Sequence, residues 1–320
     1  MPRVVVTASP GGHAGYAYAV GVELVRLGVD VLFLVPRGHE VWVRRFSRLG
    51  AVREVTLPRR YGEHLLRAVP RLGRAFIEAL RAVGGADAVL GTGASLSVPP
   101  GVAARLRGRR LAILESMPRF TRPGLANRVL APLADLVLVH WEEQVSLYPR
   151  ARRVEAVGPV YEPPRYQPRR GSYILVTTGS VGHRMLLDVA AELGSEEVVL
   201  QTGMVDPERY QGRPGVRAFR WSDDIDSWIA GARVVVTHVG MTAAKAALGY
   251  GKPTVVAASP HIVIPERDAR LYAEKIGAVY LDRLEPGALR RALEEAESNP
   301  PRRVPSGARR AAKLVAGLLA

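Results

Sequence analysis

A histidine that follows two glycines near the start of the chain has the chemistry of a proton acceptor. The apolar run Val4–Val6 is typical of a buried strand, and Ser9-Pro10-Gly11-Gly12-His13 leads from it into a helical pattern. Glycines let the backbone approach an anion, and the first N–H groups of a helix attract one. Because imidazole can take up a proton near neutral pH, His13 is a candidate general base or ligand contact. The alternative is a histidine that caps or packs the turn.

Two further segments of the first half place polar groups directly after predicted strands. Gly91-Thr92-Gly93 follows one strand, and Glu115, four residues before Arg119, follows the next. Because ligands of open α/β sheets bind outside the carboxyl ends of the strands, we expect these residues to lie beside His13. The alternative for Glu115 and Arg119 is an ion pair that only fixes its own loop.

The second half of the chain repeats this design twice. Thr177-Thr178-Gly179-Ser180 follows a predicted strand, and Thr237-His238-Val239-Gly240-Met241-Thr242 leads into a helix that ends at Gly251-Lys252-Pro253. Each loop predicts an anion site at a helix N-terminus, and the pair is enough to hold a diphosphate without a metal ion. No Asp-x-Asp pair stands after a strand as a metal site would need. Asp223-Asp224-Ile225-Asp226 is instead typical of a helix N-cap with first-turn acids.

The elements that must position these loops alternate between short apolar strands and helical patterns. Such alternation predicts parallel sheets built from βαβ units, in two Rossmann-like α/β domains. The Pro- and Arg-rich stretch Tyr161–Gly171 predicts a linker, so we place the domains at 1–166 and 167–320. The last predicted helix, about 307–319, is a candidate to cross back to the first domain. Strands are predicted at Arg3–Thr7, Asp30–Val35, Ala88–Leu90, Arg110–Leu114, Leu136–His140, Val154–Val157, Tyr173–Thr177, Glu197–Gln201, Val216–Phe219, Val234–Thr237, Thr254–Ala257 and Ala278–Tyr280.

Composition favours a protein that binds anions. The net charge is +15, and of 45 basic residues only four are lysines. The arginine excess favours nucleotides, pyrophosphates or anionic lipid as partners, and a GC-rich or thermophilic source is the alternative explanation. Without an RNA-binding motif, zinc knuckle or basic-aromatic ladder, nucleic acid is not an expected partner. The chain has no Cys, and it shows neither a signal peptide nor an apolar run of about 20 residues, so we expect a cytoplasmic protein.

One segment between strands is amphipathic. From Tyr61 to Leu80 the apolar residues recur at helical spacing, arginines cover the opposite face, and Pro70 is expected to kink the helix. One interpretation is an ordinary helix that covers the sheet. The other is a basic amphipathic element that lies on an anionic membrane surface.

Together these segments resemble glycosyltransferases of the GT-B fold. The nearest resemblance is to the two-subunit N-acetylglucosaminyltransferase that adds the second GlcNAc to a dolichyl-pyrophosphate-linked sugar, with the two subunits fused. Residues 1–160 are similar to its acceptor subunit, and residues 172–285 to its donor subunit. The first match rests on the segments 11–13, 91–93 with Pro99, 114–116 with Arg119, and 132–142, and the second on 176–179, 223–229, 234–240 and 250–253. The peptidoglycan lipid-intermediate GlcNAc transferase is a more distant relative of the same kind.

The resemblance implies two Rossmann-like domains that face a central cleft, with UDP-GlcNAc as the donor. Where the family carries a Glu that holds the donor's ribose, this chain has Ala246, and Asp268-Ala269 stands in place of a His-Gln pair. Glu266 and Asp268 are the candidates to supply the missing contacts. Acceptor relatives commonly carry an N-terminal membrane anchor, so attachment at the inner face of the cell membrane is expected to fall to Tyr61–Leu80.

The predicted activity is transfer of GlcNAc from UDP-GlcNAc to a lipid-pyrophosphate-linked sugar, with inversion and without a metal or cofactor. His13 would remove the proton of the acceptor hydroxyl, and Glu115 would orient His13 or the acceptor. Two alternatives stay open: a nucleotide-sugar epimerase of the same fold, and a non-catalytic nucleotide-sugar- or lipid-binding subunit, which Ala246 favours. The expected acceptor-binding residues are Gly11, Gly12, Gly91, Thr92, Gly93 and Arg119, and the expected nucleotide-sugar-binding residues are Thr178, Gly179, Ser180, His238, Gly240, Met241, Thr242, Glu266 and Asp268.

Overall fold

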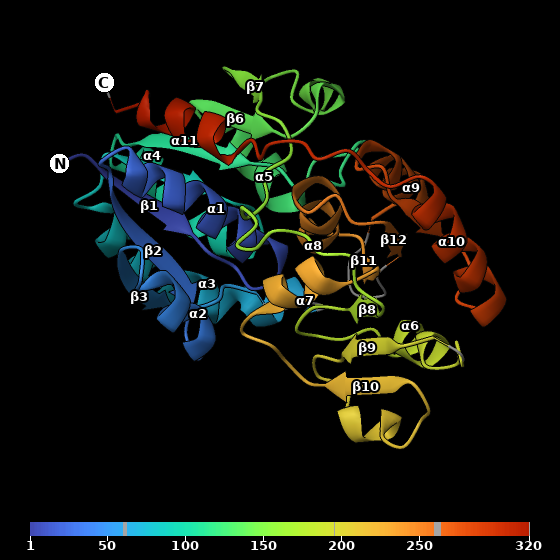
Figure 1. Ribbon diagram of the computed structural model, residues 1–320. Helices are drawn as coiled ribbons and strands as arrows, with labels where there is room; N and C mark the ends of the chain where they lie inside the picture. Colours follow the sequence, from blue (N-terminus) through green and yellow to red (C-terminus); the bar gives the residue numbers. More distant parts are fainter. Residues whose placement is uncertain (60–62, 195, 259–263, 320) are drawn as a thin grey trace. The chain divides into compact units, whose positions relative to one another are not determined.

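The computed structural model divides the chain into two compact units (Figure 1). Unit 1 comprises Met1–Glu162 together with Ser306–Ala320, and unit 2 comprises Pro163–Pro305. The structure describes residues 1–59, 63–194, 196–258 and 264–319. Each unit is an α/β domain built on one parallel sheet, as the sequence predicts.

The sheet of unit 1 has seven parallel strands in the order β3-β2-β1-β4-β5-β6-β7. The central strands are apolar and buried on both faces, because helices cover both sides of a parallel sheet. The strands are β1 (Arg3–Thr7), β2 (Asp30–Pro36), β3 (Ala51–Val55), β4 (Ala88–Gly91), β5 (Arg110–Leu114), β6 (Leu136–Val139) and β7 (Val154–Ala156).

Helices pack against both faces of this sheet. One face buries Val5, Leu111 and Ile113 against α3, α4 and α5. On the other face, Phe33 of β2 stacks on Phe46 of α2 with ring centroids 4.6 Å apart. The helices of unit 1 are α1 (Gly12–Arg26), α2 (Glu40–Phe46), α3 (Leu65–Val83), α4 (Val98–Leu106), α5 (Leu125–Leu130) and α11 (Ala308–Ala316), with short 3₁₀ turns η1 (Ser95–Ser97), η2 (Ala131–Leu133) and η3 (Glu142–Leu147).

The sheet of unit 2 has six parallel strands in the order β10-β9-β8-β11-β12-β13. Numbered from its own first strand, this order is 3-2-1-4-5-6, the order of the Rossmann fold. The strands are β8 (Ile174–Thr177), β9 (Val198–Gln201), β10 (Val216–Phe219), β11 (Val234–His238), β12 (Thr254–Ala257) and β13 (Val279–Leu281).

Alternate side chains of these strands enter two separate apolar clusters. Ile174 and Val176 pack with α6 and α10 on one face, whereas Leu175 packs with α7 and with Ala246 and Tyr250 on the other. The helices of unit 2 are α6 (Arg184–Ala190), α7 (Ile225–Gly231), α8 (Met241–Ala244), α9 (Glu266–Lys275) and α10 (Pro286–Ser298), with a 3₁₀ turn η4 (Pro207–Tyr210) and a π-helical turn η5 (Lys245–Gly249) that continues α8.

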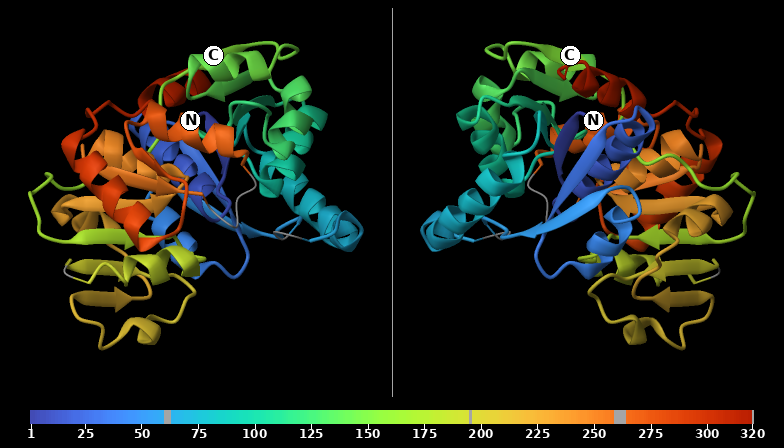
Figure 2. Two further views of the ribbon diagram at one scale, coloured as in Figure 1. Left: turned by 90° about the vertical axis from the view of Figure 1, so that its right-hand side faces the viewer. Right: turned by 90° about the vertical axis from the view of Figure 1, so that its left-hand side faces the viewer.

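The end of the chain returns to unit 1. Helix α11 packs beside α1, and Figure 2 shows the N- and C-terminal segments in the same unit. The return point is bonded to the exit point: Tyr161 donates its N–H to Ser306 Oγ at 3.1 Å, and the Ser306 hydroxyl donates to Tyr161 O at 2.8 Å. Unit 2 is therefore inserted between two adjacent points of unit 1.

Candidate active site

Both sheets reverse their strand order at one point, and the predicted loops border that point. In unit 1 the reversal lies between β1 and β4, so the segment after Thr7 and the segment after Gly91 face each other. In unit 2 it lies between β8 and β11, beside Gly179 and Gly240. Ligands of open α/β sheets bind at such switch points, so each unit has one candidate ligand site at its strand ends.

A short hydrogen bond joins the two loops of unit 1. His13 Nδ1 lies 2.6 Å from the carbonyl oxygen of Thr92. Since a carbonyl oxygen only accepts, Nδ1 must carry the proton and Nε2 is left as the basic nitrogen. Gly93 makes room for the ring, because a Cβ there would lie 2.7 Å from His13 Cε1. The sequence prediction that His13 lies beside Gly91–Gly93 is therefore confirmed.

The surroundings of His13 keep its imidazole neutral. Burial lowers the pKa of His13 below its usual value of 6.5, and the nearby charge of Arg119 lowers it further. The bond to Thr92 and the charge of Glu115 act in the opposite direction without reversing the net effect. A neutral imidazole with a free Nε2 can accept a proton at pH 7.

Glu115 is buried and holds the loop that follows β5. Its carboxylate accepts hydrogen bonds from the N–H of Ser116 at 2.6 Å, from the N–H of Gly124 at 2.9 Å and from the hydroxyl of Tyr148. These bonds connect the two ends of the loop that carries Arg119. The carboxylate thus fixes its loop through these bonds, and its charge also acts on His13.

Tyr16 and Gln144, which the sequence analysis did not single out, complete this part of unit 1 together with His140. Tyr16 lies one turn after His13 in α1, and its hydroxyl accepts the N–H of Met117 at 3.2 Å. His140 donates from Nε2 to Glu115 O at 2.7 Å, since its Nδ1 accepts the N–H of Val160 at 3.0 Å. The amide of Gln144 donates to carbonyl oxygens of the Glu115 loop. The i, i+3 spacing of His13 and Tyr16 on a predicted helix could have indicated that Tyr16 lies on the same face as His13.

The two predicted anion loops of unit 2 lie around one imidazole. A Cβ on Gly179 would lie 3.3 Å from Cε1 of His238, and one on Gly240 would lie 3.9 Å from its Nε2. Thr178 is buried, and its hydroxyl donates to Gln201 O at 3.4 Å. Gly240 precedes the first turn of α8, which Met241 and Thr242 form. The structure therefore brings these predicted donor-site residues together, and the exposed Ser180 follows Gly179 in the same loop.

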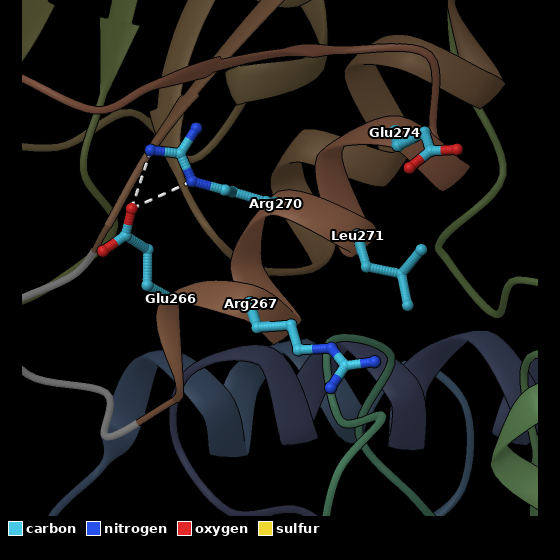
Figure 3. Close-up of a pocket in the computed structure, with 5 residues that line it drawn as sticks. All are labelled: Glu266, Arg267, Arg270, Leu271 and Glu274. Atoms are coloured by element: carbon cyan, nitrogen blue, oxygen red, sulfur yellow. Dashed lines mark hydrogen bonds and ion pairs between the residues drawn. The ribbon is translucent and has the colours of Figure 1, made fainter.

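The residues predicted to replace the family's ribose contacts lie apart from one another in α9. Glu266 is exposed and accepts hydrogen bonds from Arg270, at the shallow surface pocket drawn in Figure 3. Asp268, two residues on, is fully buried. Ala246 is also fully buried and packs in the apolar cluster of Leu175 and Val235. The side chain at position 246 therefore contributes to the core.

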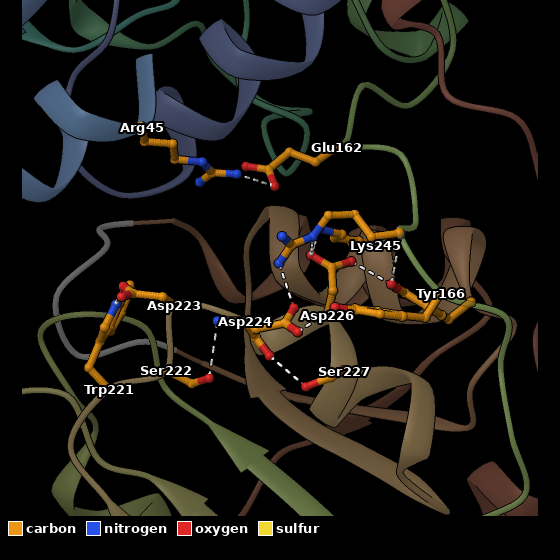
Figure 4. Close-up of polar contacts among 12 residues, drawn as sticks. Arg45, Glu162, Tyr166, Trp221, Ser222, Asp223, Asp224, Asp226, Ser227 and Lys245 are labelled. Atoms are coloured by element: carbon orange, nitrogen blue, oxygen red, sulfur yellow. Dashed lines mark hydrogen bonds and ion pairs between the residues drawn. The ribbon is translucent and has the colours of Figure 1, made fainter. Parts of the chain in front are cut away.

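The acidic residues at the start of α7 form ion pairs with arginine and lysine side chains (Figure 4). Asp224 stands at the predicted N-cap position, yet its carboxylate accepts from Arg165 Nη2 at 2.5 Å and from the Tyr166 hydroxyl at 2.6 Å. The predicted side-chain cap is therefore wrong, because these two donors take the carboxylate. Asp226, in the first turn as predicted, forms a buried ion pair with Lys245 at 2.6 Å.

The amphipathic segment is helix α3, and Pro70 lies inside it. Tyr61 lies outside the described residues, as do the side chains of Leu65 and Leu66. Ala79, Phe76 and Leu80 pack in the core cluster on the sheet, whereas Val69, Leu72 and Ile77 are exposed. Within the described part of the chain, no helix is both long and apolar enough to span a membrane. In the same part, no three His, Asp or Glu side chains are grouped as a metal site.

Comparison with known protein families and sequences shows which proteins this chain is similar to. Residues 4–139 match the model of the glycosyltransferase family 28 N-terminal domain. A relative from Moorella thermoacetica is 30% identical over an alignment that covers 88% of this chain and 86% of the relative. That relative is the UDP-N-acetylglucosamine--N-acetylmuramyl-(pentapeptide) pyrophosphoryl-undecaprenol N-acetylglucosamine transferase.

Solved structures of the same architecture include transferases and an epimerase. MurG of Acinetobacter baumannii superimposes with a TM-score of 0.64 at 18% identity, over 99% of this chain and all of that one. A protein from Listeria monocytogenes assigned as a UDP-N-acetylglucosamine 2-epimerase gives a TM-score of 0.70 at 13% identity, over 99% and 95% of the two chains. At these identities the likeness shows the fold alone, the GT-B fold that the sequence predicts.

Proposed function

This chain belongs to glycosyltransferase family 28, and we propose that it transfers GlcNAc from UDP-GlcNAc to a lipid-pyrophosphate-linked sugar. The observation that carries the proposal is the bond from His13 Nδ1 to Thr92 O, which leaves a neutral Nε2 at the switch point of unit 1. The named activity of the full-length relative supports the donor and the class of acceptor.

In the proposed reaction the acceptor hydroxyl attacks C1 of the donor sugar. Its proton passes to His13 Nε2, a bond forms from the acceptor oxygen to C1, and the bond from C1 to the diphosphate oxygen breaks. The diphosphate leaves with the electron pair. A single displacement of this kind inverts the configuration at C1, and general-base help is typically worth about 10²–10⁴-fold.

The donor diphosphate is proposed to bind at the strand ends of unit 2. The N–H groups of Gly240, Met241 and Thr242 stand at the start of α8, where the helix dipole favours negative charge. Thr178 and Gly179 supply the second loop. Backbone donors at both loops would stabilise the leaving diphosphate without a metal ion.

The acceptor has two candidate forms. The sequence resemblance is to an enzyme of dolichyl-linked N-glycan assembly with fused subunits, whereas the relative found here acts on an undecaprenol-linked muramyl pentapeptide. Both acceptors are amino sugars on a lipid pyrophosphate, and the proposal is confined to that class. An acceptor of this kind would bring the enzyme to the cytoplasmic face of a membrane, where the exposed Val69, Leu72 and Ile77 of α3 would contact lipid.

The test is transfer of radiolabelled GlcNAc from UDP-GlcNAc to each of the two lipid-linked acceptors, with EDTA present. We expect EDTA-resistant product from the wild type, and a loss of about 10²–10⁴-fold in His13→Ala with nucleotide binding kept. His39→Ala, at a half-buried histidine of the same unit, is the matched control and should keep full turnover. Near-normal turnover of His13→Ala would refute the base assignment.

Two alternatives give different products in the same assay. The epimerase, which the Listeria neighbour favours, would convert UDP-GlcNAc to an epimer without any acceptor. The non-catalytic subunit, which the buried Ala246 favours, would bind nucleotide-sugar without turnover. Chromatography of the nucleotide-sugar pool after incubation without acceptor separates these outcomes.

A further inference from the structure

A chain of buried hydroxyl groups encircles the turn that bonds to His13. The N–H of Thr92 donates to Thr7 Oγ1 at 3.1 Å, and Thr7 Oγ1 lies 2.8 Å from Ser97 Oγ. Ser97 donates its own proton to Gly93 O at 2.6 Å, so the proton between the two hydroxyls belongs to Thr7. The order of donation is therefore Thr92 N–H to Thr7, Thr7 to Ser97, and Ser97 to the carbonyl of Gly93. We call this sequence of bonds the hydroxyl chain.

The hydroxyl chain holds a strained piece of backbone. Ala94, with φ at 58°, is the only non-glycine residue with a left-handed φ in the described part of the chain, and Gly93 before it has φ at 96°. Such conformations cost energy and persist where surrounding bonds impose them. The Thr92 hydroxyl adds a further bond to Thr7 O at 2.6 Å, so Thr92 is fixed at its N–H and at its side chain. Its carbonyl is left to accept His13 Nδ1.

Unit 2 shows which part of this arrangement is special to unit 1. There too a threonine hydroxyl donates to the last carbonyl of the first strand, from Thr237 to Thr177 O at 2.7 Å. The hydroxyl of Thr177, however, accepts from the side chain of Gln201 at 3.1 Å. The hydroxyl at the end of the first strand thus accepts from a side chain in unit 2, whereas in unit 1 it accepts from the backbone of the turn that bonds to His13.

We propose that Thr7 is a positioning residue for the general base, because its hydroxyl fixes the Thr92 carbonyl that keeps the proton of His13 on Nδ1. The inference rests on the proposed function, in which Nε2 accepts the proton of the acceptor. Thr7 touches neither substrate in that scheme and acts through Thr92. Which imidazole nitrogen carries the proton is set by the partner of the other nitrogen, so loss of the fixed carbonyl releases the tautomer.

The test compares Thr7→Val, which has the same shape without the hydroxyl, with Thr7→Ser, which restores it. For Thr7→Val we expect kcat to fall about 10–100-fold, by analogy with the effect of removing an outer hydrogen-bond partner of a metal-bound histidine. The KM for UDP-GlcNAc should stay within about twofold, because the donor loops belong to unit 2. Thr7→Ser should return kcat to within about threefold of the wild type, since the hydroxyl chain can form again.

The decisive readout is the ¹⁵N spectrum of histidine-labelled protein, with the His13 signals assigned from His13→Ala. The wild type should show protonated Nδ1 and unprotonated Nε2, and Thr7→Val should show proton density on Nε2. Thr254→Val is the matched control: this buried threonine donates to Lys252 O at 2.7 Å, and its loss should change neither kcat nor the His13 signals. If Thr7→Val fails to fold, Ser97→Ala replaces it with the same expectations, since it removes both the acceptor of the Thr7 hydroxyl and the bond to Gly93 O.

Unchanged kcat and unchanged His13 signals in a folded Thr7→Val or Ser97→Ala protein would overturn the inference. The proposed function fails separately, by normal turnover of His13→Ala. Because the ¹⁵N readout does not depend on turnover, the two failures are distinguishable.

Discussion

Glu115 and Arg119 lie on one loop and shift the pKa of His13 in opposite directions. The carboxylate raises it and the guanidinium lowers it, beneath a larger lowering by burial. In Arg119→Gln the pKa of His13 should therefore rise, and the acidic limb of kcat/KM should move to higher pH. Glu115→Gln should move that limb to lower pH. Rate measurements from pH 5 to 8 check both signs, and a shift in the same direction for both variants would contradict the assignment. Arg122→Gln, an exposed arginine of the same loop, is the control.

His140 is expected to make the protein sensitive to acid. Burial lowers the pKa of His140 from 6.5 to about 4, so the unfolded state binds the proton first as the pH falls. Below about pH 6.5 the folded state therefore loses stability, by roughly 3 kcal/mol at pH 4. In His140→Gln the unfolding free energy should be lower at pH 7 and should fall less steeply from pH 6.5 to 4.5. Urea unfolding across that range measures the difference, and parallel curves for the two proteins would refute it.

The buried pair of Asp226 and Lys245 should be costly to break. Burial alone would raise the pKa of Asp226, but the charge and hydrogen bond of Lys245 hold it below its usual value. Lys245→Met should destabilise unit 2 by about 3 kcal/mol, which is the low end of the range for breaking a buried ion pair. The cost is at the low end because Tyr250 and Arg165 still contact the carboxylate. The difference from wild type should shrink as the pH falls through the lowered pKa of Asp226, where the carboxylate takes up a proton.

A surface ion pair gives the control for that measurement. Arg184 and Asp188 lie 3.6 Å apart on α6, and the arginine is mostly exposed. Arg184→Met should cost less than about 1 kcal/mol. Equal costs for the buried and the exposed pair would show that Lys245 makes no special contribution.

Helix α3 is expected to bind anionic vesicles through its exposed apolar residues. Val69 is 58% exposed and Ile77 is 53% exposed, while Phe76 packs on the core, so the first two can be changed without opening unit 1. Val69→Ser/Ile77→Ser should sediment less with vesicles that contain anionic lipid, with unfolding temperature kept. Leu27→Ser, an exposed leucine at the end of α1, is the matched control. Undiminished sedimentation of the α3 variant would remove this helix from the membrane proposal.

Apolar runs in the sequence predicted most of the fold. The one strand that was missed lacks such a run. All twelve predicted strands are present within one or two residues at their ends. Most of them are apolar and buried throughout, whereas β7, β10 and β13 are only partly buried. The missed strand, β3, is an edge strand of sequence Ala-Val-Arg-Glu-Val and is largely exposed. With Arg53 and Glu54 in its middle, β3 has no apolar run by which it could be predicted.

The candidate site was predictable only where backbone position decides the contact. His13 and Thr92 follow adjacent strands of the sheet, and strand order alone brings them together. The bonds of Glu115 to Tyr148 and of Asp224 to Arg165 depend on side chains that reach across the fold from distant segments. No local pattern encodes such partners. The π-helical turn at Lys245–Gly249 is likewise a tertiary outcome that helical periodicity did not predict.

The return of α11 to unit 1 has a consequence for synthesis on the ribosome. The nascent chain completes every residue of unit 2 before α11 is translated, so unit 2 can fold while unit 1 still lacks its last helix. During that interval the surface of α1 that receives Ala311, Ala312 and Val315 stays uncovered. Translation that stops early would leave a folded unit 2 attached to an unfinished unit 1, with an apolar surface open to aggregation or to a chaperone.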